Sequence, residues 1–355
     1  MKHKYISFKR ELASYGMEKL IEDDIVNRDM KIFSDDNFVY IPLTEFPENI
    51  ETLPGFVSTG EREFERRNVN KKPFLTIKEA CKNAGIPQDC ISEIPNRWEL
   101  FGNVCIINIP ECLLHHEKKI GEIYSKVLNA ETVMNRTGII SGETRKPNLK
   151  MIYGTNPIAR YIENGIIFTF DTRKLMFSKG NKTERMRITS KIKKGEKVWD
   201  MFAGIGYFSL PIAVYSEPDK IVSTEINSIS YEYLVKNAKL NNAENIEAIN
   251  IDNRQYESYS EKFDHIIMGY LHETYSFLPY AIRSLKNGGW IHYHTVVNTK
   301  EYKKNAFDEV NSYLKANYPE KMEVVNITEY DVTEVKSYAP CLSHVVMDFR
   351  LKIRN

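Results

Sequence analysis

The sequence of 355 residues lacks long hydrophobic runs, cysteine pairs and an excess of charge of either sign. No stretch approaches 18 consecutive apolar residues, which excludes a membrane-spanning helix. Charge returns at Lys9 and Arg10, too soon after the first methionine for a secretory signal peptide. We therefore expect a cytoplasmic globular protein without a membrane partner.

Cysteine is scarce and is not arranged for disulfides or metal. The five cysteines, an odd number, include no Cys-x-x-Cys pair. Since reducing compartments disfavour disulfides, we expect reduced and mostly packed thiols. His115 with His116, and His292 with His294, have no neighbouring cysteine or acid at ligand spacing, so we predict no metal site.

The net charge of +1 is a cancellation between distant segments. Residues 11–60 carry eight more acids than Lys and Arg, whereas residues 171–197 hold ten Lys and Arg against three acids. A basic run of this kind is either a solvated helix face or a contact for a phosphate backbone. Arg145, Lys146, Lys150 and Arg160 extend the positive charge, so a nucleic-acid partner is not excluded.

Three changes of pattern predict three domains. Residues 1–70 form a small first domain, with strands at 38–43 and near 56–57 and a charged linker at 61–73. Residues 75–163 form a mixed α and β domain, because helical spacing at 76–84 and 118–128 flanks a buried strand at 104–110.

Residues 164–355 alternate between strands and helices, which predicts an α/β domain with a mostly parallel sheet covered on both faces. The expected strands are 166–170, 197–202, 220–224, 246–251, 265–268, 290–296, 323–328 and 344–351. The expected helices are 181–193, 206–215, 228–241, 274–286 and 300–316. The last two strands lack a long helix between them and are expected to pair antiparallel.

A strand that ends in Asp200, followed by Gly204 and Gly206 and then a helix, is the strongest functional signal. Two glycines let the backbone turn sharply and approach a ligand. The third glycine of a dinucleotide fingerprint is missing, since position 209 is serine, and this argues against a pyrophosphate cradle.

Acids follow the next two strands. Glu225 is placed to accept both hydroxyls of a ribose, and Asp252, or the backbone around Asn253, to meet an adenine edge. This arrangement matches S-adenosylmethionine sites; the alternative is a turn with capping acids and no ligand. At the end of the fourth strand, Tyr270 either stacks on a nucleobase or packs in the core.

Several fragments resemble the enzymes that modify position 37 of tRNA. They are Met176–Arg185, Asp200–Phe208, Glu225–Asn227 and Met268–Tyr270, with Pro95–Val104 and Val335–Pro340 similar to the shared middle and carboxyl-terminal parts. One branch of this family methylates N1 of guanosine 37. The other transfers the 3-amino-3-carboxypropyl group of S-adenosylmethionine to C7 of 4-demethylwyosine in phenylalanine tRNA. Residues 1–70 match only loosely.

Two departures favour the second branch. The methyltransferases usually carry Ser-Pro-Arg where this chain has Ser178-Lys179-Gly180, and Asn-Leu-Pro or a similar triplet where it has Met268-Gly269-Tyr270. Methylation of N1 requires a base for the N1 proton, whereas a ring carbon can attack first and lose its proton afterwards. N1 methylation remains the alternative; a nicotinamide-dependent dehydrogenase and a non-catalytic RNA-binding protein are the other classes.

The resemblance implies a class I methyltransferase-like (Rossmann-type) catalytic domain with a seven-stranded sheet, preceded by smaller α+β domains. It also implies a monomer that uses S-adenosylmethionine on the anticodon loop of tRNA. Arg145 and Glu184 match the catalytic arginine and glutamate of the methyltransferases. The implied cofactor residues are Phe177, Ser178, Arg185, Asp200, Phe202, Gly204, Gly206, Glu225, Ile226, Asp252, Asn253, Met268 and Gly269. The implied base-contacting residues are Lys179, Asn181, Lys182 and Tyr270.

Overall fold

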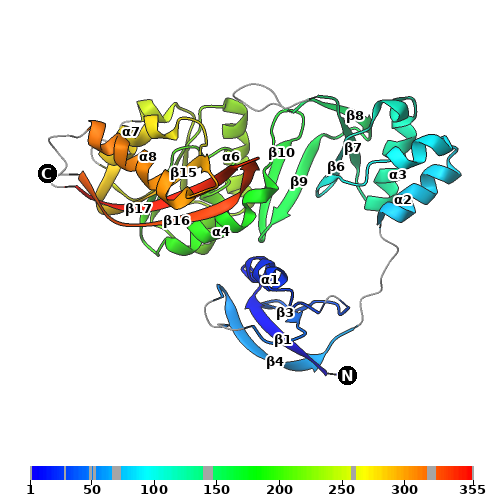
Figure 1. The fold of residues 1–355 in the computed structure, drawn as a ribbon, viewed down its shortest axis with the longest axis horizontal. Helices are drawn as coiled ribbons and strands as arrows, with labels where there is room; N and C mark the ends of the chain where they lie inside the picture. The colour runs from blue at the N-terminus through cyan, green and yellow to red at the C-terminus, as the bar shows by residue number, and fades with distance from the viewer. Residues whose placement is uncertain are drawn as a thin grey trace. The chain divides into compact units, whose positions relative to one another are not determined.

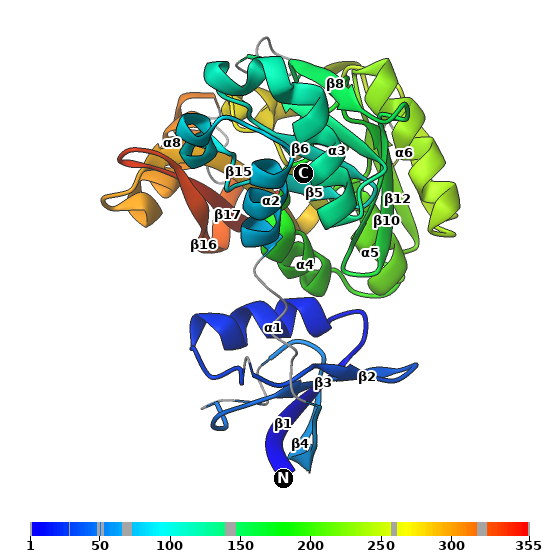
Figure 2. The ribbon, with the colours of Figure 1, turned by 90° about the vertical axis from the view of Figure 1, so that its right-hand side faces the viewer.

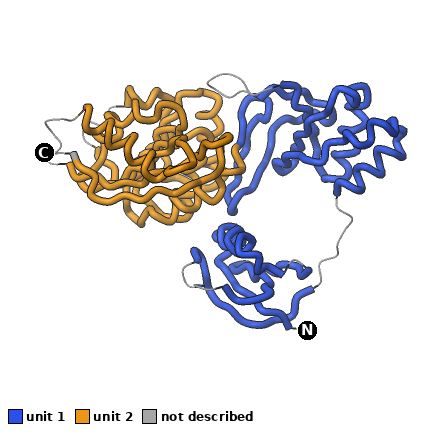
Figure 3. Tube along the Cα trace, viewed as in Figure 1, with its two compact units in different colours: residues 1–177 blue, residues 178–355 orange. Residues whose placement is uncertain are grey.

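The computed structural model describes residues 2–27, 29–47, 50, 53–65, 73–138, 147–256, 261–317 and 325–353. The chain divides into two compact units, residues 1–177 and residues 178–355, coloured separately in Figure 3. Each unit is described by itself.

The first unit begins with a four-stranded antiparallel sheet in the order β2-β3-β1-β4. Its elements are β1 (Lys2–Lys9), α1 (Ala13–Glu22), β2 (Phe33–Ser34), β3 (Phe38–Pro42) and β4 (Phe56–Glu63). Figure 2 shows α1 on one side of this sheet. The helix buries Leu20 against Ile6 and Phe8 of β1, which closes a small core.

The predicted linker at 61–73 is wrong at its start, because β4 runs through Glu63 and pairs with β1 as far as Lys2. β4 is an edge strand whose residues alternate between half-buried and exposed. Charged side chains suit such an edge, since they face water while the backbone still pairs. Residues 66–72 of the predicted linker lie outside the described part of the chain.

The rest of the first unit confirms the predicted helices and buried strand. Its elements are α2 (Pro73–Asn83), η2 (Gln88–Glu93), β5 (Glu99–Phe101), β6 (Val104–Ile107), η3 (Glu111–His116), α3 (Glu117–Leu128), β7 (Thr132–Arg136), β8 (Leu149–Tyr153), β9 (Ile158–Glu163) and β10 (Ile166–Asp171), where η marks a 3₁₀ helix. β5 to β8 form one sheet. The strand predicted at 166–170 forms as β10 but pairs with β9 in a separate two-stranded sheet, not with the seven-stranded sheet of the second unit.

The second unit has a seven-stranded, mostly parallel sheet, as expected. Its elements are η4 (Lys179–Asn181), α4 (Lys182–Lys191), β11 (Lys197–Asp200), α5 (Ser209–Tyr215), β12 (Lys220–Thr224), α6 (Ser228–Leu240), β13 (Ile246–Ile249), η5 (Asn253–Gln255), β14 (Phe263–Met268), η6 (Thr274–Phe277), α7 (Leu278–Ser284), β15 (Leu285–Asn298), α8 (Tyr302–Asn317), β16 (Val325–Ala339) and β17 (Leu342–Ile353). The strand order is β13-β12-β11-β14-β15-β17-β16, with the pairs β15–β17 and β16–β17 antiparallel (Figure 1).

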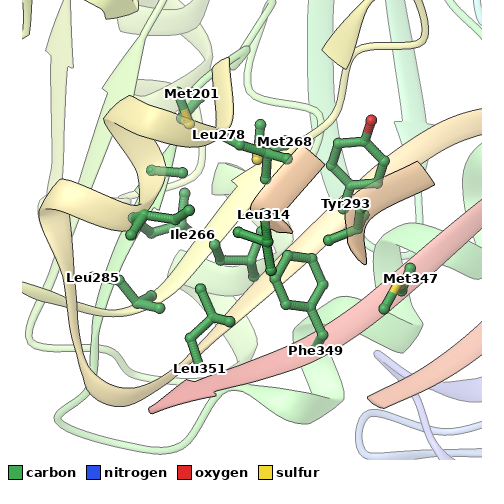
Figure 4. Close-up of a cluster of buried hydrophobic side chains, with 14 of the residues drawn as sticks. Met201, Ile266, Met268, Leu278, Leu285, Tyr293, Leu314, Met347, Phe349 and Leu351 are labelled. Carbon is green, nitrogen blue, oxygen red and sulfur yellow. The ribbon is translucent and has the colours of Figure 1, made fainter. Parts of the chain in front are cut away.

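Both faces of this sheet are buried. On one face, Trp199 packs with α7 and α8 in a large cluster. Ile266, Leu278 and Leu314 of this cluster are labelled in Figure 4. On the other face, α4 and α5 cover a second cluster that includes Val198. The chain leaves β11 towards β12 on one side, and β14 lies on its other side. Ligands of such sheets bind at this switch point, outside the carboxyl ends of the strands.

We expect Gly102→Ala to destabilise the first unit far more than Gly85→Ala. Both glycines have positive φ, +58° and +76°, but a Cβ on Gly102 would lie 2.0 Å from the carbonyl oxygen of Arg160, whereas nothing lies within 4 Å of one on Gly85. Backbone strain alone costs about 1–2 kcal/mol, and a clash with a fixed carbonyl adds about 1–3 kcal/mol. Native-state hydrogen exchange of the β6 amides measures both losses; equal losses would contradict the clash.

Candidate functional site

The turn after β11 is fixed by a buried serine. Asp200 is fully buried; its Oδ2 accepts a hydrogen bond from Ser209 Oγ at 2.6 Å, and its Oδ1 accepts one from the Phe202 N–H at 3.4 Å. Ser209 Oγ in turn accepts a hydrogen bond from Ser223 Oγ at 2.8 Å. The residue that replaces the third glycine of a dinucleotide fingerprint therefore ties the start of α5 to β11 and β12.

The two glycines set the backbone path of the loop after β11. Gly204 and Gly206 have φ of +58° and +99°, which other residues rarely adopt. A Cβ on Gly206 would lie 2.7 Å from the side chain of Leu210. The Gly204 N–H donates to Glu225 Oε2 at 2.8 Å, and this hydrogen bond joins the loop to the end of β12.

Glu225 suits a ribose diol. Its Oε1 accepts the Asn227 N–H at 2.8 Å, and because each carboxylate oxygen has two lone pairs, both oxygens keep acceptor capacity. Burial raises the pKa of Glu225, while backbone N–H groups oppose this shift. The next side chain, Ile226, is 69% exposed and offers an apolar surface beside the carboxylate.

The two predicted adenine contacts differ. Asp252 is engaged by Arg254 at 2.5 Å, and this hydrogen bond lowers the pKa of Asp252. Asn253 is buried and donates through Nδ2 to the Met201 carbonyl at 2.8 Å, while its Oδ1 has no hydrogen-bond partner within the described residues. Buried acceptors are rarely left unsatisfied, so Asn253 Oδ1 is the better placed of the two for a ligand N–H.

The corner after β14 is closely packed. Met268 is fully buried in the cluster of Figure 4, and a Cβ on Gly269 would lie 3.0 Å from the ring of Phe208. The Tyr270 ring stacks on Phe202, with centroids 5.1 Å apart and 14° between the planes. Tyr270 is half-buried, so one of its faces is already occupied by protein.

The segment 178–185 lies against the glycine loop, which is the turn after β11 that carries Gly204 and Gly206. Arg185 is 2% exposed, donates to the Ser178 carbonyl at 2.7 Å, and has its guanidinium 5.1 Å from the centroid of the Tyr207 ring. Lys336 Nζ of β16 donates to Ser178 Oγ at 3.2 Å. A Cβ on Gly180 would lie 3.0 Å from the same Nζ, so Gly180 and this lysine are close neighbours.

Other predicted residues have different surroundings. Phe177 belongs to the first unit, where it is buried in an aromatic cluster with Phe101, Tyr161, Phe168 and Phe170. Lys179, Asn181 and Lys182 lie in η4 and at the start of α4. Arg145 lies outside the described residues.

Glu184 is 3% exposed and forms a bidentate pair with Arg187, at 2.7 and 2.9 Å. Burial raises the pKa of Glu184, and Arg187 opposes the shift. Arg187 also donates to Asp348 of β17 at 2.5 Å. His292 Nδ1 lies 2.6 Å from Asp348 Oδ1, an acid that comes from the distant strand β17 and that sequence spacing does not reveal.

Part of the basic stretch serves internal contacts. Ion pairs join Arg173 to Asp171, Arg187 to Glu184 and Asp348, Lys191 to Asp348, Lys194 to Glu217 and Lys197 to Glu261. These side chains weaken the interpretation of residues 171–197 as one phosphate-binding surface. Across the described part of the chain, no three His, Cys, Asp or Glu are grouped to hold a metal ion, and no helix is long and apolar enough to cross a membrane.

We expect Asp200→Asn to stabilise the protein in alkaline solution. Burial raises the pKa of Asp200 from 3.8 to about 6, so the folded state binds the proton more tightly than the unfolded chain does. Above pH 6 the ionised Asp200 therefore lowers the free energy of unfolding. Below pH 4 the group is protonated in both the folded and the unfolded state and has no such effect. Urea unfolding should show a gain of about 1–3 kcal/mol at pH 8 that disappears near pH 4. Asp308→Asn, at an exposed position of α8, is the control; a gain equal at both pH values would contradict the burial effect.

Three family models match successive parts of the chain. Residues 159–325 match the TRM5/TYW2 methyltransferase domain, residues 77–157 the TYW2 N-terminal domain, and residues 18–51 the tRNA methyltransferase 5 N-terminal domain.

Named relatives come from both branches. The chain is 37% identical over 267 residues to a tRNA(Phe) (4-demethylwyosine(37)-C(7)) aminocarboxypropyltransferase of Pyrococcus horikoshii, covering 75% of this chain and 93% of that protein. It is 32% identical over 336 residues to the tRNA (guanine(37)-N(1))-methyltransferase Trm5b of Pyrococcus abyssi, covering 94% of each.

The fold agrees with these matches. The structure of P. horikoshii TYW2 in complex with MeSAdo superposes with a TM-score of 0.65 at 32% identity, covering 79% of this chain and 99% of that one. A related TYW2 from Methanocaldococcus jannaschii was solved in complex with AdoMet. With the glycine loop, Glu225 and the seven-stranded sheet in the arrangement described above, the chain belongs to the TRM5/TYW2 family.

Proposed function

We propose that this protein is an S-adenosylmethionine-dependent tRNA-modifying transferase that moves the 3-amino-3-carboxypropyl group to C7 of 4-demethylwyosine at position 37 of phenylalanine tRNA. The observation that carries the proposal is the corner after β14. Buried Met268 and close-packed Gly269 offer no side-chain amide for the N1 edge of a guanine. The identity to the aminocarboxypropyltransferase of P. horikoshii supports the same activity.

The residues at the switch point fit S-adenosylmethionine. Glu225 accepts from the ribose hydroxyls, Asn253 Oδ1 accepts from a donor of the adenine edge, and Ile226 covers the apolar face of the base. Gly204 and Gly206 give the loop the positive φ angles of its turn. When bound, the cofactor supplies a sulfonium whose γ-carbon is open to attack.

The transfer of the 3-amino-3-carboxypropyl group needs no oxidant or reductant. A C–C bond forms between C7 and the γ-carbon, the γ-carbon–sulfur bond breaks, and its electron pair stays on the sulfur of the departing 5′-methylthioadenosine. C7 then loses its proton. The bidentate Arg187 contact supports this chemistry over N1 methylation, because Glu184 is engaged on both oxygens and is poorly disposed to take a proton from a guanine before attack.

The tRNA partner is part of the proposal. Lys179 and Lys182 lie where η4 meets α4, next to Ser178, and are suited to the backbone of the anticodon loop. The three-domain division at residues 70–75 and 163–164 stays a prediction, with residues 1–70 as a further tRNA contact.

N1 methylation of guanosine 37 is the second candidate. The observation that favours it is the match of residues 18–51 to the N-terminal domain of tRNA methyltransferase 5, together with the 94% coverage by the methyltransferase of P. abyssi.

Separately labelled S-adenosylmethionine distinguishes the two reactions. With precursor phenylalanine tRNA that carries 4-demethylwyosine, we expect a carboxyl-carbon label to enter tRNA and methylthioadenosine to be released. With unmodified guanosine at position 37, we expect neither label to transfer. Methyl label in tRNA, with S-adenosylhomocysteine as the product, would refute aminocarboxypropyl transfer.

We expect Glu225→Gln to weaken binding of S-adenosylmethionine about 10- to 100-fold, because a charged acceptor of two hydroxyls is lost. Binding of tRNA should be unchanged. Calorimetry measures the first and filter binding the second. Glu232→Gln, on the exposed side of α6, is the matched control. An equal loss of both affinities in Glu225→Gln would argue against the ribose role.

A further inference from the structure

Two of the five cysteines lie together in the first unit. Cys90 belongs to η2 and Cys112 to η3, and they are 22 residues apart in the chain. Cys90 Sγ lies 3.7 Å from the carbonyl oxygen of Cys112 and donates to it. A hydrogen bond also joins the thiol of Cys90 to that of Cys112. The two sulfur atoms are therefore neighbours, although the sequence has no Cys-x-x-Cys pair.

Reagents in solution can reach this pair of thiols. Cys112 is exposed and Cys90 is half-buried. The other cysteines of the first unit, Cys81 and Cys105, are both buried, and burial raises the pKa of Cys81 to about 11. Because a cysteine reacts as an accessible thiolate, the two buried cysteines are inert by comparison.

The two thiols of the pair differ in reactivity. Partial burial, the thiol of Cys112 and the acids Asp89 and Glu93 raise the pKa of Cys90. Cys90 therefore forms a thiolate less readily and reacts more slowly with an oxidant in solution. The exposed Cys112 meets the oxidant first. Cys90, held beside it, then reacts within the same molecule, which proximity favours.

The pair joins two segments that contribute to one hydrophobic core. η2 supplies Ile91 and η3 supplies Leu113 to a cluster that also contains residues of α2, α3 and β6. Both side chains are at most 2% exposed, and Cys90 packs against the same cluster. A covalent bond between η2 and η3 would therefore restrain two segments that help to close this core.

We propose that Cys90 and Cys112 are a redox-active pair, which a peroxide closes to a reversible disulfide that fixes η2 to η3. Hydrogen peroxide oxidises the thiol of Cys112 to a sulfenic acid and releases one water. Cys90 Sγ then attacks Cys112 Sγ: the S–S bond forms, the S–O bond breaks, and the hydroxyl leaves with the thiol proton of Cys90 as a second water. A thiol reductant restores both thiols by exchange.

The proposal agrees with the expectation of reduced thiols, because a disulfide in a reducing compartment is usually transient. The bond closes a loop of 22 residues that contains β5 and β6. A cross-link of this kind removes conformational freedom from the open chain, so local opening of the loop becomes rarer.

Mass spectrometry of the whole protein tests the pair directly. After one equivalent of hydrogen peroxide, we expect two fewer thiols to react with iodoacetamide, and a digest to contain a peptide in which Cys90 is linked to Cys112. Dithiothreitol should restore all five labels. Sulfinic acid at Cys112 with Cys90 still labelled, or a disulfide that joins two copies of the chain, would overturn the proposal.

Two variants separate the roles of the thiols. Cys90→Ser should accumulate a sulfenic acid at Cys112 that dimedone traps, whereas Cys112→Ser should slow the oxidation of Cys90 about tenfold or more. Cys341→Ser is the matched control, because Cys341 is exposed but lies in the second unit. This control should form the disulfide at the wild-type rate. Equal rates of oxidation in the first two variants would contradict the order of the steps.

Hydrogen exchange measures the effect of the bond on the fold. The amide of Leu113 donates to the carbonyl of Pro110 at 3.0 Å. We expect this amide to exchange about 10- to 100-fold more slowly in the oxidised protein than in the reduced one. Amides of β12, in the second unit, should keep their rates. An unchanged rate at Leu113 in protein that mass spectrometry shows to be oxidised would refute the restraint of η3.

Discussion

The buried ion pair between Arg187 and Asp348 sets the geometry of the second unit. It joins α4, which precedes the sheet in the chain, to β17, which comes near its end. Because both side chains are largely removed from water, the loss of either would leave the other with only part of its compensation, from Glu184 for Arg187 and from Lys191 for Asp348. The pair therefore fixes which face of α4 turns inward, and with it the directions of Glu184 and Arg185.

The loop that carries Gly204 and Gly206 depends on a similar restriction, made by two hydroxyls and a buried carboxyl group. Ser209 donates to Asp200 and accepts from Ser223, so the first residue of α5 is fixed to two strands. A glycine at position 209 would allow a phosphate to approach the helix but would lose both bonds. Serine in place of the third glycine therefore stabilises the loop, and it favours a ligand without a pyrophosphate.

Local patterns in the sequence predict much of this unit. The order of strands and helices, the glycine turn and the acid after β12 follow from periodicity and from turn chemistry, which act over a few neighbouring residues. The same reasoning fails at β4, where Glu61 and Glu63 look like linker residues, because pairing with β1 and not side-chain burial holds the strand. It also assigns β10 to the wrong sheet, since hydrophobic periodicity does not identify a partner strand.

The contacts that the sequence does not predict are those between distant segments. Lys336 reaches Ser178, and Asp348 meets both His292 and Arg187, through the antiparallel pairing of the last strands. These contacts also change the meaning of the charge balance. At least five cations of residues 171–197 form ion pairs with acids of this protein. The net charge of residues 171–197 therefore overstates the positive charge that is available to a polyanion. A tRNA contact here would therefore depend on where the individual lysines lie.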